Sequence, residues 1–210
     1  MMRRSALALI LPFLLALPPS TAPAQQPYDL LVRGGRVLDG TGAPWVRADV
    51  AITGDRIVAV GRLPDAAARR VIDASGLRVA PGFIDVHSHA GSALSDSTLA
   101  GAWPLLAQGI TTIVVNPDGG GPVDLTKQRA AIEARRPGVN VVPLIGHGAV
   151  RRDVLAMEDR APTAVELARM QALVRAAMEQ GAFGLSSGLY YAPGSYAQTE
   201  EVIELAKVAA

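Results

Sequence analysis

The feature that most constrains the fold is a change of rhythm at Pro81 and Gly82. Beyond it, four short apolar stretches alternate with longer segments whose apolar residues recur at helical spacing. Parallel strands need a long crossover between them, so this alternation predicts an α/β fold with a parallel sheet and helices outside it. The expected strands are residues 83–86, 111–115, 141–145 and 183–186, and the expected helices are residues 98–108, 125–135, 163–180 and 199–209.

The third of these helices has the strongest signals. Thr163 and Glu166 have the spacing of a capping box, and Gly181 is placed to end the helix. Its apolar stripe is predicted to face the core and not a cofactor. That stripe consists of Leu167, Met170, Val174, Ala177 and Met178.

The segment before Pro81 follows another pattern. Its short apolar stretches end in Gly or Asp-Gly, which is typical of short antiparallel strands and hairpins. We therefore expect two parts: a small β-sandwich subdomain over residues 25–80, and the α/β part over residues 81–210.

Residues 1–24 have the pattern of a signal peptide. Arg3 and Arg4 precede an apolar run over residues 6–17, and Ala22 and Ala24 are small residues at alternate positions. The run is shorter than the roughly 20 residues that span a bilayer. We expect cleavage near Ala24, a periplasmic or secreted protein, and no membrane attachment afterwards.

Composition narrows the possible chemistry. The chain has no cysteine, so it has neither a disulfide framework nor a thiolate that could bind a metal. Without residues 1–24, 18 basic residues face 19 acidic ones, a formal charge of −1. That balance argues against a nucleic-acid-binding surface.

Chain length leaves two architectures open. A complete (β/α)₈ barrel needs about 250 residues, whereas 130 residues follow Ala80 and the sequence stops within an expected helix. The α/β part is either a small open sheet or the first four βα units of a barrel. We favour the partial barrel.

His87 and His89 follow the first expected strand and are one residue apart. Residues i and i+2 of an extended segment point the same way, so the two imidazoles can form a metal clamp. The alternative is two polar residues at a strand end near solvent. Because reactive residues of parallel α/β folds gather at the carboxyl ends of strands, the metal interpretation is favoured.

Asp118 follows the second expected strand and should lie at the same rim. A dinuclear zinc site needs an anionic bridge, which a carboxylated lysine, a thiolate or a carboxylate can supply. The chain has no cysteine, and its two lysines, Lys127 and Lys207, lie on expected helices. Asp118 is the remaining candidate, unless the Asn-Pro-Asp-Gly segment is simply a turn.

The third and fourth expected strands lead to candidate substrate contacts. His147 stands between two glycines and either binds substrate or hydrogen-bonds the rim. Ser187 follows the fourth strand, and Tyr190 and Tyr191 are adjacent there, so one can pack while the other offers its hydroxyl to a carbonyl oxygen.

Three segments together resemble the amidohydrolase superfamily, and within it the N-acyl-D-amino-acid deacylase (D-aminoacylase) family. They are PGFIDVHSH, QGITTIVVN and GAFGLSSGLYYAPGSYAQTEE. The resemblance runs from about Asp29 to the end of the chain and implies a zinc-dependent hydrolase, with one or two ions, built on a distorted (β/α)₈ barrel.

The resemblance also implies residue roles. His87 and His89 match the family's first metal pair, and Asp118 stands where these deacylases usually carry a bridging cysteine. Tyr191 matches a tyrosine that contacts the substrate carbonyl. The Ala90 that follows His89 departs from the usual His-x-His-Asp. The remaining histidine ligands and the catalytic aspartate are expected beyond Ala210, so the chain alone is expected to be inactive.

The resulting expectation is hydrolysis of N-acyl-D-amino acids, which are small-molecule substrates, to a carboxylate and a D-amino acid. One alternative is a cyclic-amide hydrolase of the hydantoinase or dihydroorotase kind, which the absence of a lysine after the fourth strand disfavours. The other is a truncated, non-catalytic homologue.

The export signal gives the first testable prediction. We expect the mature protein to begin near Gln25, because signal peptidases cut after small residues at alternate positions. Mass spectrometry of the periplasmic or secreted product measures the new N-terminus. A soluble cytoplasmic protein that still carries Met1 would contradict export.

Overall fold

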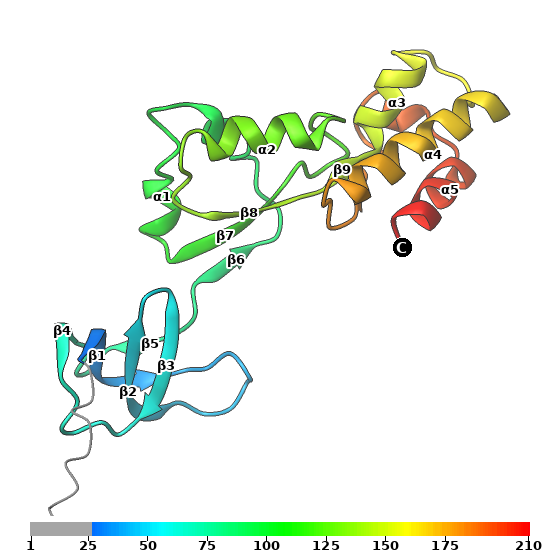
Figure 1. The fold of residues 1–210 in the computed structure, drawn as a ribbon. Helices are drawn as coiled ribbons and strands as arrows, with labels where there is room; N and C mark the ends of the chain where they lie inside the picture. Colours follow the sequence, from blue (N-terminus) through cyan, green and yellow to red (C-terminus); the bar gives the residue numbers. More distant parts are fainter. Residues whose placement is uncertain (1–26) are drawn as a thin grey trace, which may run out of the picture. The chain divides into compact units, whose positions relative to one another are not determined.

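The structure, a computed structural model, describes residues 27–210. They divide into two compact units, and the boundary along the chain falls between Ala80 and Pro81 (Figure 1). None of the helices described here combines the length and the hydropathy that a membrane crossing requires.

Residues 27–80 form one five-stranded sheet with the strand order β3-β2-β1-β4, and β5 pairs with the end of β1. The strands are β1 (Tyr28–Val37), β2 (Val46–Thr53), β3 (Arg56–Gly61), β4 (Ala68–Asp73) and β5 (Arg78–Val79). The predicted antiparallel hairpins are present for β1, β2 and β3, but β4 and β5 run parallel to β1. A second layer, which a sandwich requires, is not formed within residues 27–80.

Residues 81–210 have the predicted alternation of strands and helices. The strands are β6 (Phe83–Asp85), β7 (Ile110–Val115), β8 (Asn140–Pro143), β9 (Ile145–Gly146) and β10 (Leu185–Ser186). The helices are α1 (Trp103–Leu106), α2 (Leu125–Glu133), α3 (His147–Leu155), α4 (Ala164–Glu179) and α5 (Thr199–Ala209), with short 3₁₀ turns at Ala93–Ser95 and Gly194–Tyr196.

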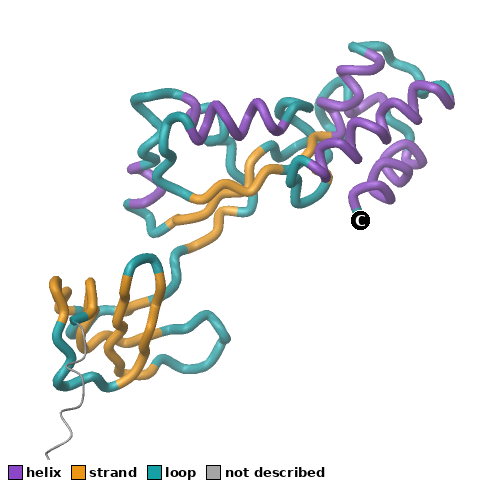
Figure 2. Tube along the Cα trace, in the orientation of Figure 1, coloured by secondary structure: helices purple, strands orange, loops and turns teal. Residues whose placement is uncertain are grey.

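All strand pairs in this unit are parallel, in the order β6-β7-β8 followed by β9-β10. The expected strand 141–145 is interrupted at Leu144, which separates β8 from β9. The Leu144 amide still donates to the Val115 carbonyl of β7 at 3.2 Å, before the chain moves over to pair with β10. Figure 2 shows β6, β7 and β8 side by side, with helix α2 running along them.

Two apolar clusters support these strands. Ile132 of α2 packs with Ile113 and Val115 of β7, while Met170 and Val174 of α4 pack with residues of β9, α3 and α5. Met170 is fully buried and Met178 packs against the same cluster, so these two methionines of α4 are core residues as predicted.

Two helices differ from the expectation. The predicted helix 98–108 shortens to α1, because Ala102 has left-handed backbone (φ 51°) and Pro104 lacks the amide proton that a preceding turn would need. Helix α3 was not predicted, because His147 lies between two glycines, which are poor helix formers.

The N-terminus of α4 supplies a stability prediction. Thr163 Oγ1 accepts a hydrogen bond from the Glu166 amide at 3.3 Å, and the Glu166 carboxylate accepts one from the Thr163 amide at 2.8 Å, which is the predicted capping box. Thr163→Ala should lower the free energy of unfolding by about 1 kcal/mol. Thr163→Ser, which keeps the oxygen, should remain close to wild type in denaturant unfolding, and equal midpoints for all three proteins would contradict the cap.

Candidate metal centre

His87 and His89 lie on the segment that leaves β6. The His87 amide donates to the Asp85 carboxylate at 3.0 Å, and the amide of the intervening Ser88 donates to the Val114 carbonyl of β7 at 2.9 Å. Ser88 is buried and both histidines are exposed. Anchoring Ser88 on β7 therefore turns both imidazoles to the solvent side, with ring centres 5.4 Å apart.

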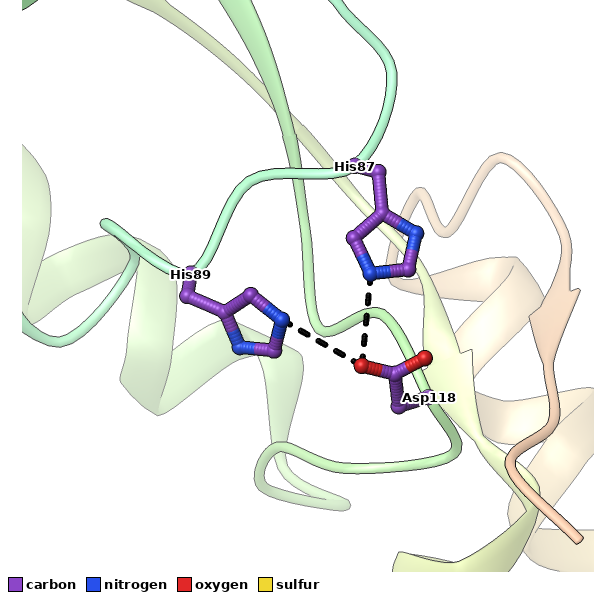
Figure 3. Close-up of side chains that lie close together, drawn as sticks. All are labelled: His87, His89 and Asp118. Atoms are coloured by element: carbon purple, nitrogen blue, oxygen red, sulfur yellow. Dashed lines mark hydrogen bonds and ion pairs between the residues drawn. The ribbon is translucent and has the colours of Figure 1, made fainter. Parts of the chain in front are cut away.

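Asp118 approaches the two histidines from the loop after β7, as Figure 3 shows. One carboxylate oxygen, Oδ2, is 3.3 Å from His87 Nε2 and 3.2 Å from His89 Nε2. The three ligand atoms lie within 4.8 Å of one another, and no other group of three such residues does so within residues 27–210.

This donor set fits a zinc-like metal. Neutral imidazole nitrogens and a carboxylate oxygen are common zinc ligands, and a catalytic zinc takes about three protein ligands plus a water. All three side chains remain partly open to solvent, which leaves room for further ligands. The structure brings together the three residues predicted from the sequence, and their role as ligands stays a prediction.

The loop that carries Asp118 has unusual backbone geometry. Asn116 and Asp118 both have left-handed backbone, with φ 63° and 55°. Among residues other than glycine, Asn and Asp adopt this region most readily, and such conformations persist only where the surroundings enforce them.

Ser186, at the end of β10, bridges this loop. Its hydroxyl donates to the Asn116 carbonyl at 2.6 Å and accepts from the Gly119 amide at 3.1 Å. The Gly119 carbonyl in turn accepts from the Ala149 amide of α3 at 2.9 Å. The loop after β7 is therefore hydrogen-bonded both to the end of β10 and to the first turn of α3.

The Asn116 side chain fixes the start of the same loop. Its amide nitrogen donates to Gln128 of α2 at 3.0 Å and to the Leu144 carbonyl at 2.9 Å, and its oxygen accepts from Gln128 at 2.9 Å. Because Asn116 is buried, these bonds satisfy groups that would otherwise be costly to desolvate.

Two glycines allow the loops to approach this closely. A Cβ at Gly146 would lie 2.1 Å from the Gly120 carbonyl oxygen, and one at Gly188 would lie 2.2 Å from the Asp118 carbonyl oxygen. Both distances are far inside van der Waals contact, so no side chain fits at either position. At these two glycines, backbone packs directly on the backbone of the loop that carries Asp118, and we call this contact the glycine floor.

A cavity of about 470 Å³ opens beside the cluster. It is lined by residues that follow β6, β7, β9 and β10, among them His89, Asp118, Arg152 and Tyr191. Tyr190 does not line it; its side chain is exposed and its ring meets that of Tyr191 edge-on, with centres 5.4 Å apart. Of the two predicted tyrosines, Tyr191 is thus the one beside the cavity.

His147 lies away from the cavity lining. Its side chain is fully buried at the start of α3, and its Nε2 lies 2.8 Å from a carboxylate oxygen of Glu201 on α5. The other Glu201 oxygen accepts a hydrogen bond from the buried Arg151 guanidinium. Of the two roles considered for His147, hydrogen bonding is the one observed, and contact with substrate stays a prediction.

The buried network of His147, Arg151 and Glu201 lowers the pKa of the Glu201 carboxyl. Burial acts to raise the pKa of its carboxyl, but the hydrogen bonds from His147 and Arg151 and the charge of Arg151 hold that pKa below its ordinary value of 4.5. The carboxylate therefore stays ionised inside the protein and ties α5 to α3.

The cavity lining includes Arg152, which was not among the predicted site residues, and does not include Ser187, which was. Ser187 is exposed and does not line the cavity, so its predicted substrate contact is untested, while its neighbour Ser186 holds the loop. Arg152 lines the cavity but was not singled out. The signal was present in the spacing: if a helix starts at His147, Arg151 shares its buried face, and Arg152 is turned about 100° from it.

Comparison with known proteins finds similarity over the part of the chain that contains the candidate site. A sequence profile described as "Amidohydrolase family" matches residues 70–209. A D-aminoacylase from Alcaligenes xylosoxydans xylosoxydans is 39% identical over 87% of this chain and 42% of its own length. The chain spans about two fifths of the length of that relative.

Solved structures show similarity to the same group of enzymes. An N-acyl-D-glutamate deacylase from Bordetella bronchiseptica, complexed with zinc and a phosphonate that mimics the tetrahedral intermediate, has a TM-score of 0.79 and 38% identity, covering 88% of this chain and 43% of that one. A D-hydantoinase from a Bacillus species has a TM-score of 0.54 and 21% identity, covering 86% and 38%. The second likeness extends to the fold alone.

The buried network yields a pH-dependent prediction. The folded-state pKa of Glu201 is depressed, so its stabilising contribution is complete above the unfolded pKa of 4.5 and is lost as pH falls through the folded value. Glu201→Gln leaves Arg151 buried without a counter-charge, and we expect the free energy of unfolding at neutral pH to fall by about 3–5 kcal/mol.

Denaturant unfolding at neutral pH and again below pH 4.5 measures both effects. The difference between wild type and Glu201→Gln should narrow as the pH falls below 4.5, because the wild-type carboxyl is protonated first in the unfolded protein and then, below its lower folded-state pKa, in the folded one. Glu200→Gln, at an exposed neighbouring position, is the control and should unfold like wild type. A constant difference at both pH values would contradict the role given to the Glu201 charge.

Proposed function

The chain belongs to the amidohydrolase family, and we propose that the protein to which it belongs hydrolyses the amide bond of N-acyl-D-amino acids, using a metal-activated water. The observation that carries this proposal is the convergence of His87, His89 and Asp118 beside an open cavity. The likeness to a D-aminoacylase and to an N-acyl-D-glutamate deacylase supports the substrate class.

Zinc is the metal we propose, as one or two ions. Bound at this centre, it would supply Lewis acidity that lowers the pKa of a water and polarises the amide carbonyl. His87 and His89 present Nε2 to the cluster, so each imidazole must be neutral and carry its proton on Nδ1 to act as a ligand. Asp118 contributes negative charge, and its two oxygens allow it to bridge two ions.

Tyr191 has a separate role in this proposal. It lines the cavity from the segment after β10, and Asp118 lines the same cavity from the loop after β7. Its hydroxyl can donate a hydrogen bond to the amide carbonyl oxygen, where negative charge develops as water adds to the carbon. Cleavage of the carbon–nitrogen bond then gives a carboxylate and a free D-amino acid.

We infer that this reaction takes place in the periplasm or outside the cell. The inference depends on the signal-peptide pattern of residues 1–24, which lie outside the described residues. Cyclic-amide hydrolysis is less well supported, since the hydantoinase likeness is one of fold and Ser186 at the end of β10 is occupied in holding the loop after β7.

The metal proposal is tested in the full-length protein encoded by the gene. His87→Ala and His89→Ala should lower bound zinc, measured by elemental analysis, and reduce kcat/KM for N-acetyl-D-amino acids by more than the roughly 10- to 100-fold typical of residues that only support metal ligands. Because both side chains are exposed, the free energy of unfolding of the metal-free protein should not change.

Asp118 is tested with a pair of variants. Asp118→Asn removes the negative charge and should lower zinc content, whereas Asp118→Cys restores an anionic ligand and should retain metal with a preference shifted to softer ions. Asp153→Asn, on an exposed stretch of α3, is the control. Wild-type metal content and turnover in Asp118→Asn would make Asp118 an ordinary turn residue.

A further inference from the structure

Arg152 is the only cationic side chain other than histidine among the residues that line the cavity. The remaining lining residues are mainly glycines and small polar residues, with Asp118 as the single acid. Apart from the proposed metal, a guanidinium in such surroundings is the main local attraction for an anionic ligand, and its planar donors match the geometry of a carboxylate.

The position of Arg152 follows from its neighbour. Arg151 is fully buried and hydrogen-bonds Glu201 and the carbonyls of Glu158 and Arg160. These contacts fix the rotation of α3 about its own axis. Since consecutive residues on a helix point about 100° apart, the buried Arg151 leaves Arg152 on the cavity side.

Arg152 is also free to bind a ligand. Within residues 27–210 its guanidinium has no ion pair and no hydrogen bond. By contrast, Arg160 pairs with Glu158 and Glu166, and Arg169 pairs with Asp153. An unpaired guanidinium beside a candidate metal centre has donors available that the fold itself does not use.

We propose that Arg152 binds the α-carboxylate of the N-acyl amino acid and so positions the amide carbonyl at the metal centre. This inference rests on the proposed function and deepens it. In every N-acyl amino acid the α-carboxylate is separated from the amide carbonyl only by the nitrogen and the α-carbon. One cavity lined by His89, Asp118, Tyr191 and Arg152 can therefore hold both groups of one substrate.

The test compares a charged substrate with a neutral one in the full-length protein. For Arg152→Gln we expect KM for N-acetyl-D-alanine to rise roughly 10- to 100-fold, the range for hydrogen bonds to charged groups, with a smaller change in kcat. KM for N-acetyl-D-alaninamide, which lacks the carboxylate charge, should stay unchanged. Arg152→Lys should recover part of the loss, because it restores the charge without the planar fork.

Arg175→Gln, an exposed arginine on α4, is the matched control and should behave like wild type with both substrates. Equal KM changes for the acid and the amide, or none for either, would overturn the assignment. A loss seen only with N-acetyl-D-glutamate would assign Arg152 to a side-chain carboxylate and would overturn it equally.

A binding measurement separates this inference from the proposed function. Calorimetric titration of N-acetyl-D-alanine into the metal-free protein should show weaker binding to Arg152→Gln than to wild type. If wild type binds in this way but hydrolyses neither substrate, the proposed reaction fails and the Arg152 site stands. If both proteins bind N-acetyl-D-alanine equally, the Arg152 site fails whatever the activity.

Discussion

The candidate metal centre depends on a short loop held in left-handed backbone. Asn116 and Asp118 have positive φ angles, and in that conformation one oxygen of the Asp118 carboxylate lies within 3.3 Å of Nε2 of both histidines. The loop is held there by the Ser186 hydroxyl, which binds it at two points, and by the Asn116 amide, which reaches α2 and the segment after β8. The strain of the loop is offset by bonds from three other parts of the unit.

A buried charged network holds helix α3, which contributes Gly148 and Arg152 to the cavity lining. Glu201 of α5 joins His147 and Arg151 of α3, across about 50 residues of sequence. Such networks add less to stability than their contacts suggest, because desolvating the charges opposes their attraction. Their geometry is nevertheless strict, since a buried charged group that loses its partner is costly. Here that geometry sets the rotation of α3 and with it the residues that α3 presents to the cavity.

The sequence predicted the parts that follow from periodicity and strand polarity. The α/β fold class is confirmed by the likeness to a solved N-acyl-D-glutamate deacylase, and the convergence of His87, His89 and Asp118 follows from parallel strands ending at one edge. Helix α3 and the burial of His147 were missed, because both arise from contacts with α5 and the Gly119 loop that local propensity does not contain. The parallel pairing of β4 and β5 with β1 is likewise a property of the tertiary fold.

The glycine floor beneath Asp118 bears on how a protein of this kind changes over generations. Replacing an exposed imidazole at position 87 or 89 would remove a proposed metal ligand and leave the packing untouched. Any side chain at position 146 or 188 would collide with the backbone of the loop after β7 and force that loop to move. A single substitution could therefore remove a proposed metal ligand while the scaffold survives. Descendants that keep the glycines and lose the histidines would retain the fold without the proposed metal site, and those few positions would identify them.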